Sequence, residues 1–296
     1  SGNKYSEADS IRSMLGSKGY KINDFSSGNY LARLKDTAEM RDEKWKTISS
    51  SSNVFSNINN PNEFEFSIGL VIDGYFDDLK RCVTSIFNHD QDVTKEVIIL
   101  DNGNDDEIAK DIENLSDEFE FIKVIHADHS LGDAASKNVL IKSSKGKIFV
   151  LVDTSVEFTG PFLSRLEQLL DPQDVGIAGY AGLKTETLLH FHEGEDLSGD
   201  VDAMQAYCFA FKRESIKEVG FMRECFRFYR NLDIDFSFQF RDKDYRIVAD
   251  NTLPVTLHTH RGWDDLPVKQ RDELSRKNYG KFLKKWRNRE DLLLFR

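Results

Sequence analysis

Acidic side chains follow several short apolar runs in this 296-residue sequence, where their carboxylates could together bind a metal ion or a phosphate-bearing ligand. Ligands of parallel sheets bind beyond the carboxyl ends of the strands, so we expect the residues just after each run to meet at one edge. Like charges gathered there repel one another, and a divalent cation with a diphosphate would offset that repulsion. The residues that follow the runs are Asp73, Asp101, His126 with Asp128, and Asp153.

The elements that must position these residues alternate along the chain. Short apolar runs that alternate with helical patterns predict an α/β fold with a parallel sheet covered on both faces. For any single acid, helix capping or turn formation is the alternative interpretation, because aspartate is favoured in both places. The predicted strands span residues 66–72, 96–100, 121–125 and 148–152, and the predicted helices span residues 79–87, 108–115 and 134–142.

Composition and missing motifs exclude several classes of protein. The formal net charge of −11 argues against a nucleic-acid partner, and no apolar run is long enough to predict a transmembrane segment. Three scattered cysteines without a CxxC pair favour a reduced, cytoplasmic setting. Phosphate-loop and GxGxxG motifs are missing, and Ile72-Asp73-Gly74-Tyr75 stands where a dinucleotide fingerprint would follow the first strand.

The chain divides by composition into four parts. Residues 1–46 are polar and predict a helical extension, and residues 47–62 read as a linker because they are rich in serine and asparagine. Residues 63–263 carry the alternating strands and helices. Residues 264–296 form a C-terminal helical segment, whose basic helix is expected over Pro267–Trp286 and packs on the main domain through its apolar residues.

Several segments between about residues 64 and 286 resemble inverting family-two glycosyltransferases of the GT-A fold. The segment EVIILDNG (96–103) is similar to the second strand and the loop that holds the nucleotide base, and LGDAASKN (131–138) to the segment that brings a basic residue to the donor. GKIFVLVDTS (146–155) resembles the strand that ends in the DxD metal motif. This part of the resemblance implies a mixed, mainly parallel sheet flanked by helices.

The second half of the chain continues the resemblance. VDAMQAYCFAFKR (201–213) is similar to the acceptor-side strand, FRFYRNLDID (226–235) to the ED-x-D segment, and HTHRGW (258–263) to a late segment whose histidine reaches the metal or diphosphate. DTSVEFTG and FRFYRNLDID are most similar to a bacterial and archaeal subgroup. A separate short segment, residues 8–24, resembles the C-terminal part of cysteinyl-tRNA synthetases.

The resemblance implies transfer of a sugar from a nucleotide-diphosphate sugar to an acceptor hydroxyl, with inversion and with the help of Mg²⁺ or Mn²⁺. The general base that it implies is Asp233, whose alternative role is to cap the helix expected over residues 235–241. The implied donor-binding residues are Asp73, Asp101, Asn102, Lys137, Asp153 and Arg261. The implied metal ligands are Asp153, Ser155, His258 and His260.

The sequence departs from the family pattern at three positions. Ser155 replaces the second acid of DxD, Leu232 replaces the acid before the implied base, and Asp244 replaces a glycine. A catalytically inactive nucleotide-sugar-binding or scaffold protein therefore stays open as an alternative. A nucleotidyltransferase on a similar sheet is the other alternative, although the glycine- and arginine-rich loop that it requires after the first strand is missing.

Two histidine pairs share an i, i+2 spacing, which places both side chains on one side of an extended segment. His258 and His260 are expected to point the same way, toward phosphate or metal, whereas His190 and His192 are expected in a solvated loop. The acceptor stays open between a glycan, a lipid-linked molecule and a small molecule. Peripheral attachment to a membrane through the basic helix and formation of a homodimer stay open as well.

Overall fold

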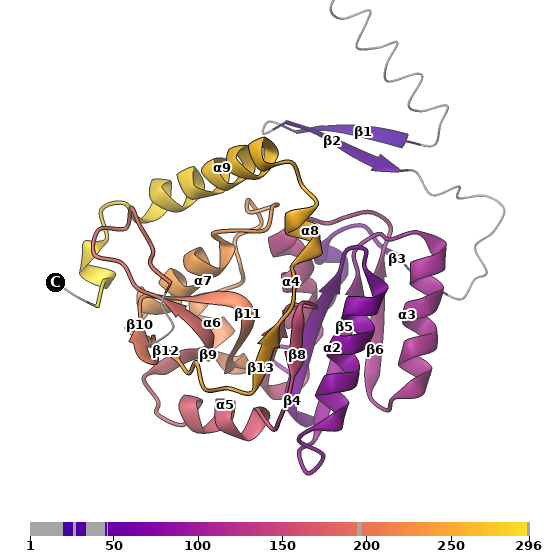
Figure 1. The fold of residues 1–296 in the computed structure, drawn as a ribbon, viewed down its shortest axis with the longest axis horizontal. Helices are drawn as coiled ribbons and strands as arrows, with labels where there is room; N and C mark the ends of the chain where they lie inside the picture. Colours follow the sequence, from indigo (N-terminus) through magenta and orange to yellow (C-terminus); the bar gives the residue numbers. More distant parts are fainter. Residues whose placement is uncertain (1–19, 26–27, 34–44, 46, 194–196, 295–296) are drawn as a thin grey trace, which may run out of the picture.

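A nine-stranded mixed sheet forms the centre of the protein (Figure 1). The computed structural model describes residues 20–25, 28–33, 45, 47–193 and 197–294. The strand order is β10-β12-β9-β11-β7-β4-β5-β6-β3. The predicted α/β architecture with a mainly parallel, helix-flanked sheet is confirmed.

The four strands predicted from apolar runs lie side by side in the parallel part of the sheet. β4 (Phe64–Ile72) pairs with β7 (Gly146–Val152) on one side and with β5 (Lys95–Asp101) on the other, and β5 pairs with β6 (Ile122–Ala127). Every residue of β5 is buried. Because all four strands run the same way, their carboxyl ends share one edge, as the sequence predicted.

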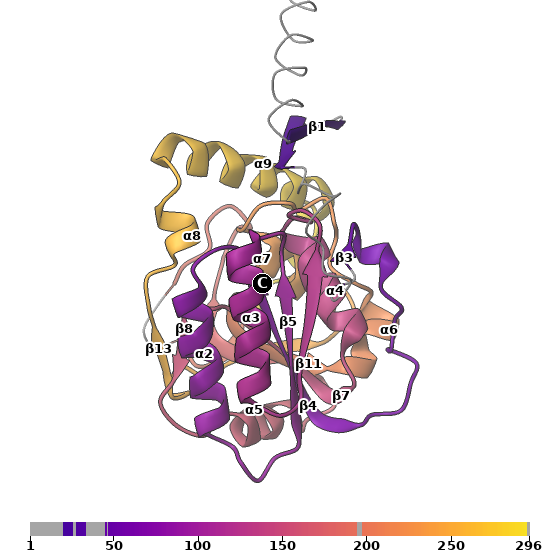
Figure 2. The same ribbon diagram turned by 90° about the vertical axis from the view of Figure 1, so that its right-hand side faces the viewer.

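Helices cover both faces of this parallel part (Figure 2). The apolar sides of α2 (Phe76–Asn88) and α3 (Asp106–Glu118) belong to one core cluster, with alternate residues of β4 and β5. α4 (Asp133–Ser143) packs into a second core cluster on the opposite face. The sequence predicted all three helices, although each is longer by a few residues than its periodicity indicated.

The second half of the chain extends the sheet with strands of both directions. β11 (Ala203–Lys212) is antiparallel to β7 and to β9 (Val175–Leu183), which explains why the sheet is mixed. The remaining strands are β3 (Thr47–Ile48), β10 (Gly199–Val201) and β12 (Arg246–Ala249) in the main sheet, and β8 (Val156–Phe158) with β13 (Val255–Leu257) in a separate pair. The remaining helices are α5 (Leu163–Leu170), α6 (Ile216–Val219), α7 (Leu232–Arg241), α8 (Arg261–Asp264) and α9 (Val268–Trp286), with short 3-10 turns at Ser51–Asn53, Arg213–Ser215 and Glu290–Leu292.

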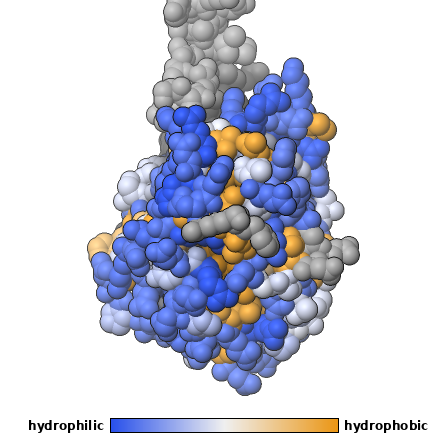
Figure 3. Space-filling view, turned by 90° about the vertical axis from the view of Figure 1, so that its left-hand side faces the viewer, coloured by the Kyte–Doolittle hydropathy of each residue, from blue (hydrophilic) through white to orange (hydrophobic). Residues whose placement is uncertain are grey.

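The basic helix α9 packs on the main domain, as predicted. Phe282 and Trp286 are almost fully buried, and the Trp286 indole N–H donates to the buried carboxylate of Asp235 at 2.7 Å. None of the helices in the described part of the chain is both long and apolar enough to span a membrane. On the face shown in Figure 3, hydrophilic side chains surround apolar patches near the middle.

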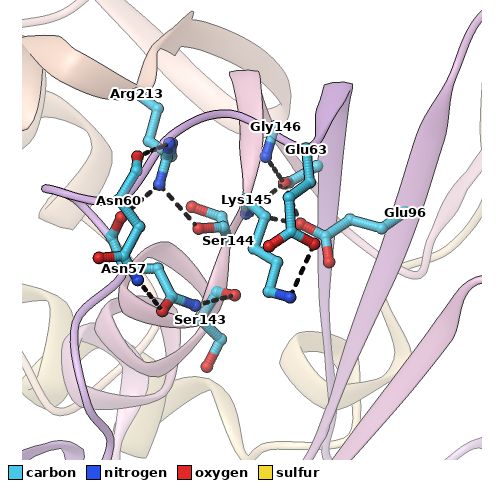
Figure 4. Close-up of polar contacts among 10 residues, drawn as sticks. Asn57, Asn60, Glu63, Glu96, Ser143, Ser144, Lys145, Gly146 and Arg213 are labelled. Carbon is cyan, nitrogen blue, oxygen red and sulfur yellow. Dashed lines mark hydrogen bonds and ion pairs between the residues drawn. The ribbon is translucent and has the colours of Figure 1, made fainter.

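The segment predicted as a linker packs against the domain instead. β3 pairs with β6, and Ile58 is only 7% exposed. The buried guanidinium of Arg213 donates to the carbonyls of Asn57 (2.6 Å) and Asn60 (2.9 Å) and to that of Ser144 (3.1 Å) (Figure 4). These bonds fix the segment to the turn before β7, because a buried guanidinium must find acceptors for its N–H groups.

The described N-terminal residues are extended rather than helical. β1 (Tyr20–Phe25) and β2 (Gly28–Arg33) form an antiparallel hairpin, so the prediction of a helical extension is wrong over these residues. A short local hairpin carries little of the periodicity on which the helix prediction relied. The apolar spacing that suggested a helix, and most of the segment similar to cysteinyl-tRNA synthetases, lie outside the described residues.

Candidate active site

A cavity of about 440 Å³ lies at the shared carboxyl edge of the parallel strands. We call it the strand-end cavity. α8 and α9 lie beyond this end of the sheet (Figures 1 and 2). Seven residues singled out from the sequence line it, namely Asp73, Asn102, Lys137, Asp153, Ser155, His260 and Arg261.

Asp153 follows β7 and has its carboxylate held in place from two sides. One oxygen accepts from the backbone N–H and the hydroxyl of Ser155, and the other lies 3.2 Å from Nε2 of His260. Burial by itself raises the pKa of Asp153, but the bonds from His260 and Ser155 outweigh burial and hold the pKa below its ordinary value. The carboxylate is therefore kept ionised at the cavity wall.

Ser155 hydrogen-bonds to Asp153 and orients its carboxylate. The side chain is only 3% exposed, and its hydroxyl donates to the Asp153 carboxylate. A second carboxylate at this position would lie against the first one, whereas a hydroxyl donates to it. The serine therefore positions Asp153, and its oxygen keeps an acceptor lone pair directed elsewhere.

The two late histidines do not converge. His260 lines the strand-end cavity, whereas His258 bonds through Nε2 to Glu157 at 2.6 Å and does not line it. The expectation that both point the same way is wrong, because the chain leaves the β13 strand after Leu257 and His260 caps the short helix α8. Asp153 raises the pKa of His260 above its ordinary value, although burial alone would lower it.

Asp101 is also placed differently from the expectation. Its carboxylate is fully buried at the end of β5, where it bonds to Nδ1 of His126 at 2.7 Å and accepts from the backbone and side chain of Asn104. Nε2 of His126 bonds to Glu113 at 2.8 Å. The acid therefore holds β5, β6 and α3 together and does not line the cavity.

Asn102 lines the cavity as a buried residue, and Asp73 lines its exposed rim. The Asn102 side chain donates to the Ser130 hydroxyl at 3.1 Å and accepts from the backbone N–H of Leu131 at 2.9 Å. It therefore orders the loop that leads into α4. Asp73 is exposed at the cavity rim directly after β4.

Two cations line the cavity, and each already has an acidic partner. Lys137 on α4 pairs with Asp133 one helical turn earlier. The Arg261 guanidinium donates to Asp78 at 2.7 Å and lies over the Tyr75 ring at 4.5 Å. These pairs hold both cations at the cavity wall, where an anionic ligand could approach them.

A second cavity of about 460 Å³ adjoins the first, and we call it the aromatic cavity. Tyr229 and His260 line both cavities, and their rings stack at 4.3 Å. Asp233 lines the aromatic cavity. The two carboxylates that the sequence assigned to metal and to base therefore face separate but adjacent spaces.

Asp233 lies in the first turn of α7 and is not its cap. The cap position belongs to Asn231, which has φ 63°, and the preceding residue Arg230 has φ 126°. This left-handed turn brings the amino end of α7 to the cavity. The Asp233 carboxylate accepts from the backbone N–H groups of Ile234 (2.9 Å) and Ala206 (3.2 Å). The predicted alternative of an N-cap is therefore wrong.

Burial raises the pKa of Asp233 above its ordinary value, and the two backbone N–H groups only partly oppose this. Asp153 experiences the opposite net shift. Two carboxylates whose environments move their pKa values apart are suited to different tasks, since the one with the raised value accepts a proton more readily.

Most residues of the aromatic cavity were not predicted as site residues, including four with polar side chains that reach it from β11 and from the loop after β9. Gln205 and Tyr207 reach it from β11, where a break in the β9 register between Met204 and Cys208 redirects the strand. His190 and His192 are exposed, as the sequence indicated, yet both line the cavity. Their i, i+2 spacing was the signal in the sequence, since it predicts two side chains that face the same space. His190 and His192 do face one cavity, whereas His258 and His260 do not.

The departures from the family pattern are accommodated locally. Asp244 keeps the left-handed conformation (φ 61°) that glycine favours, and aspartate tolerates this conformation better than most residues. Leu232 is only 2% exposed and belongs to the core next to α7. Neither change removes a group from the strand-end cavity.

Comparison with known proteins agrees with this architecture. Residues 74–187 match the family model for glycosyl transferase family 2, and no curated protein sequence matches the chain. The structure is similar to that of GalNAc-T7 with UDP, GalNAc and Mn²⁺, with a TM-score of 0.63, 14% identity, and coverage of 77% of this chain and 49% of that chain. This is the GT-A fold.

A second GT-A structure is similar over more of its own length. The mannosyltransferase PcManGT from Pyrobaculum calidifontis, in complex with GDP-Man and Mn²⁺, gives a TM-score of 0.60 at 13% identity and covers 85% of this chain and 72% of that chain. The chain spans about half the length of the GalNAc-T7 structure.

The residues of the strand-end cavity fit a divalent cation only in part by themselves. Among the described residues, no group of three or more His, Cys, Asp or Glu side chains could hold a metal ion. Asp153 offers carboxylate oxygens that suit Mn²⁺, whereas Nε2 of His260, 3.2 Å away, donates to that carboxylate and would become a second ligand only after giving up this proton. A cation here would therefore take its other ligands from water or from a bound phosphate group.

Proposed function

We propose that the protein is a nucleotide-sugar-dependent glycosyltransferase that transfers a sugar with inversion to an acceptor hydroxyl. One observation carries the proposal. Asp153 and Asp233, with oppositely shifted pKa values, face two adjoining cavities that share the Tyr229–His260 stack. The strand-end cavity would take the donor, and the aromatic cavity would take the acceptor.

Asp233 would act as the general base. As the acceptor oxygen forms its bond to the anomeric carbon, its proton passes to the Asp233 carboxylate. The bond from the anomeric carbon to the diphosphate breaks, and its electron pair leaves with the diphosphate. The raised pKa of Asp233 favours proton uptake, and the Ile234 and Ala206 N–H groups keep the carboxylate oriented.

The donor side would be held by the residues of the strand-end cavity. Asp153 and His260 would hold Mg²⁺ or Mn²⁺, which supplies Lewis-acid stabilisation for the leaving diphosphate. Lys137 and Arg261 would stabilise the negative charge of the phosphates from the cavity wall. Asn102 and Asp73 would contact the nucleoside, since both lie at the ends of neighbouring strands.

Binding of nucleotides tests the donor side of the proposal. A thermal-shift panel of UDP, GDP, dTDP and CDP with Mn²⁺ should raise the Tm of the purified protein with at least one nucleotide, because a ligand that binds only the folded state stabilises it. Asp153→Asn should abolish the Mn²⁺-dependent part of the shift. The matched control Asp117→Asn changes an exposed acid on α3 and should leave the shift unchanged.

Turnover tests the reaction itself. With the nucleotide sugar that binds, the protein should release free nucleotide, and NMR of the product should show an inverted anomeric configuration. If no nucleotide sugar binds or turns over, the protein is not a glycosyltransferase. If nucleotide binds without turnover in any acceptor mixture, the inactive sugar-binding alternative is favoured.

A further inference from the structure

The aromatic cavity is lined by polar side chains that form no hydrogen bond with any described residue. The side chains of Gln205, His190 and His192 line it, and none of them makes a hydrogen bond or an ion pair with another described side chain or backbone group. The Tyr207 hydroxyl likewise has no partner within the described part of the chain. These groups come from two separate segments, β11 and the loop after β9, and converge on one space.

Aromatic rings form part of the remaining wall of the cavity, together with aliphatic side chains such as Leu183, Leu189 and Ile234. Trp263 stands at the side of α8 and has the Arg230 guanidinium 4.7 Å from its ring centre. Tyr229 has one face covered by His260. The hydroxyl of Tyr279 on α9 donates to the carbonyl of Leu188, which fixes the ring at the cavity wall. The rings are thus held before any ligand arrives.

Aromatic rings beside polar groups that both donate and accept hydrogen bonds are complementary to a sugar ring. A sugar ring presents C–H faces, which pack on aromatic rings, and a rim of hydroxyl groups, which both donate and accept hydrogen bonds. Amide, imidazole and phenol groups likewise both donate and accept, so they suit hydroxyl groups better than they suit an alkyl chain. A lipid tail would leave the same polar groups desolvated without partners, which is costly.

We infer that the aromatic cavity binds a saccharide, and that the acceptor of the proposed transfer is therefore a carbohydrate hydroxyl. That the saccharide is the acceptor rests on the proposed function. That the cavity binds a saccharide rests on the cavity alone. Gln205 and Tyr207 recognise hydroxyl groups at the floor of the cavity, and His190 and His192 recognise them from the loop. Two carboxylates line the described part of this cavity, Asp233 and Glu193; Asp233 is held beside β11 by the N–H of Ala206, next to Gln205 and Tyr207, whereas Glu193 is exposed on the loop.

Direct binding tests the inference without requiring turnover. Saturation-transfer NMR on the full chain, with UDP or GDP and diamagnetic Mg²⁺ present, would screen free hexoses, N-acetylhexosamines, uronic acids and disaccharides. At least one should bind, and Gln205→Ala and His192→Ala should each raise its Kd about 3- to 10-fold, as expected for the loss of one hydrogen bond. The control His89→Ala changes a histidine that lines neither cavity and should leave the Kd unchanged.

Competing acceptors decide the outcome. If no saccharide binds, or if saccharides bind with a Kd that neither cavity variant changes, the inference is overturned. Transfer to a long-chain lipid alcohol or to a serine peptide, with none to saccharides, would overturn it while leaving the glycosyltransferase proposal intact. Saccharide binding that the variants weaken, in a protein that turns over no donor, would support the inference and contradict the proposed function.

Discussion

At the scale of single residues, the site depends on two carboxylates that the protein treats oppositely. Asp153 receives bonds from Ser155 and His260 and stays ionised, whereas burial makes Asp233 a better proton acceptor. Ser155 is where the sequence departs from the family pattern, and the structure gives it a definite task. Its hydroxyl donates to the Asp153 carboxylate, which is the proposed metal ligand.

That task leads to a prediction for Ser155→Ala. The variant loses the hydroxyl hydrogen bond to Asp153 but keeps the one from the backbone N–H. The Asp153 carboxylate is therefore less well ordered but still partly held in place. We expect the Mn²⁺ concentration for half-maximal activity to rise about 3- to 10-fold, which corresponds to one hydrogen bond. Ser155→Thr keeps the hydroxyl and should restore most of the affinity. Equal Mn²⁺ dependence in the alanine variant and the parent protein would show that Ser155 does not position Asp153.

Some residues of the site could be predicted from the sequence, and others could not. Asp73, Asn102 and Asp153 line the cavity because a parallel sheet brings strand ends together, which the alternating pattern already indicates. Asp101 also follows a predicted strand, but its carboxylate is hydrogen-bonded to His126 and Asn104 and does not line the cavity. Sequence spacing places a residue at the end of a strand and does not show which neighbour its side chain bonds.

At the scale of elements, one buried cluster joins strands and helix behind the site. His126 on β6 bonds to Asp101 on β5 and to Glu113 on α3. Burial lowers the pKa of His126, but the two acids outweigh burial and raise the pKa above its ordinary value of 6.5. Burial raises the pKa of Asp101, but His126 and Asn104 lower it below its ordinary value of 3.8.

The signs of these shifts predict how stability depends on pH. A raised histidine pKa contributes stability that is complete below pH 6.5 and is lost as pH rises through the folded value. The lowered aspartate pKa contributes stability that is present above pH 3.8 and lost on acidification. The free energy of unfolding, measured with urea, should therefore be higher for the parent protein than for His126→Asn, and this difference should be about 1–2 kcal/mol larger at pH 5.5 than at pH 9. A difference that is constant over this range would contradict the charged pair.

The predicted linker shows what composition cannot reveal. Its serine and asparagine content is typical of a flexible segment, yet its carbonyls accept hydrogen bonds from Arg213, which lies about 150 residues later in the sequence. Only the fold brings the two together. The four parallel strands β4, β5, β6 and β7, in contrast, were predicted to within a few residues, because burial on both faces makes them continuously apolar.

Arg213→Met tests whether this segment is part of the folded domain. The variant leaves the carbonyls of Asn57, Asn60 and Ser144 without their buried donor, so we expect a loss of about 3 kcal/mol in the free energy of unfolding. Urea titration monitored by tryptophan fluorescence would measure it. Lys217→Met, an exposed change nearby, should cost less than about 0.5 kcal/mol. Equal stability of the two variants would mean that the segment is only loosely attached.

At the scale of the whole molecule, the two halves of the sheet contribute different parts of the site. The parallel half supplies Asp73, Asn102, Lys137, Asp153 and Ser155 of the strand-end cavity, to which the segment at α8 adds His260 and Arg261. The mixed half supplies β11, α7 and the loop that line the aromatic cavity. The first half was predictable from strand–helix alternation. The second was not, because its cavity depends on an irregular strand register and on two left-handed residues before α7, which apolar patterns do not encode.

The central claim is that Asp233 removes the proton of an acceptor hydroxyl while the donor lies in the neighbouring cavity. Turnover of the nucleotide sugar by Asp233→Asn, measured beside its nucleotide Kd, tests this claim most directly. We predict a kcat about 10² to 10⁴-fold lower than in the parent protein, with nucleotide affinity unchanged and with Asp117→Asn fully active. A kcat within about 2-fold of the parent value would contradict the assignment of Asp233 as the base, because a loss of that size is only about 0.4 kcal/mol in transition-state free energy.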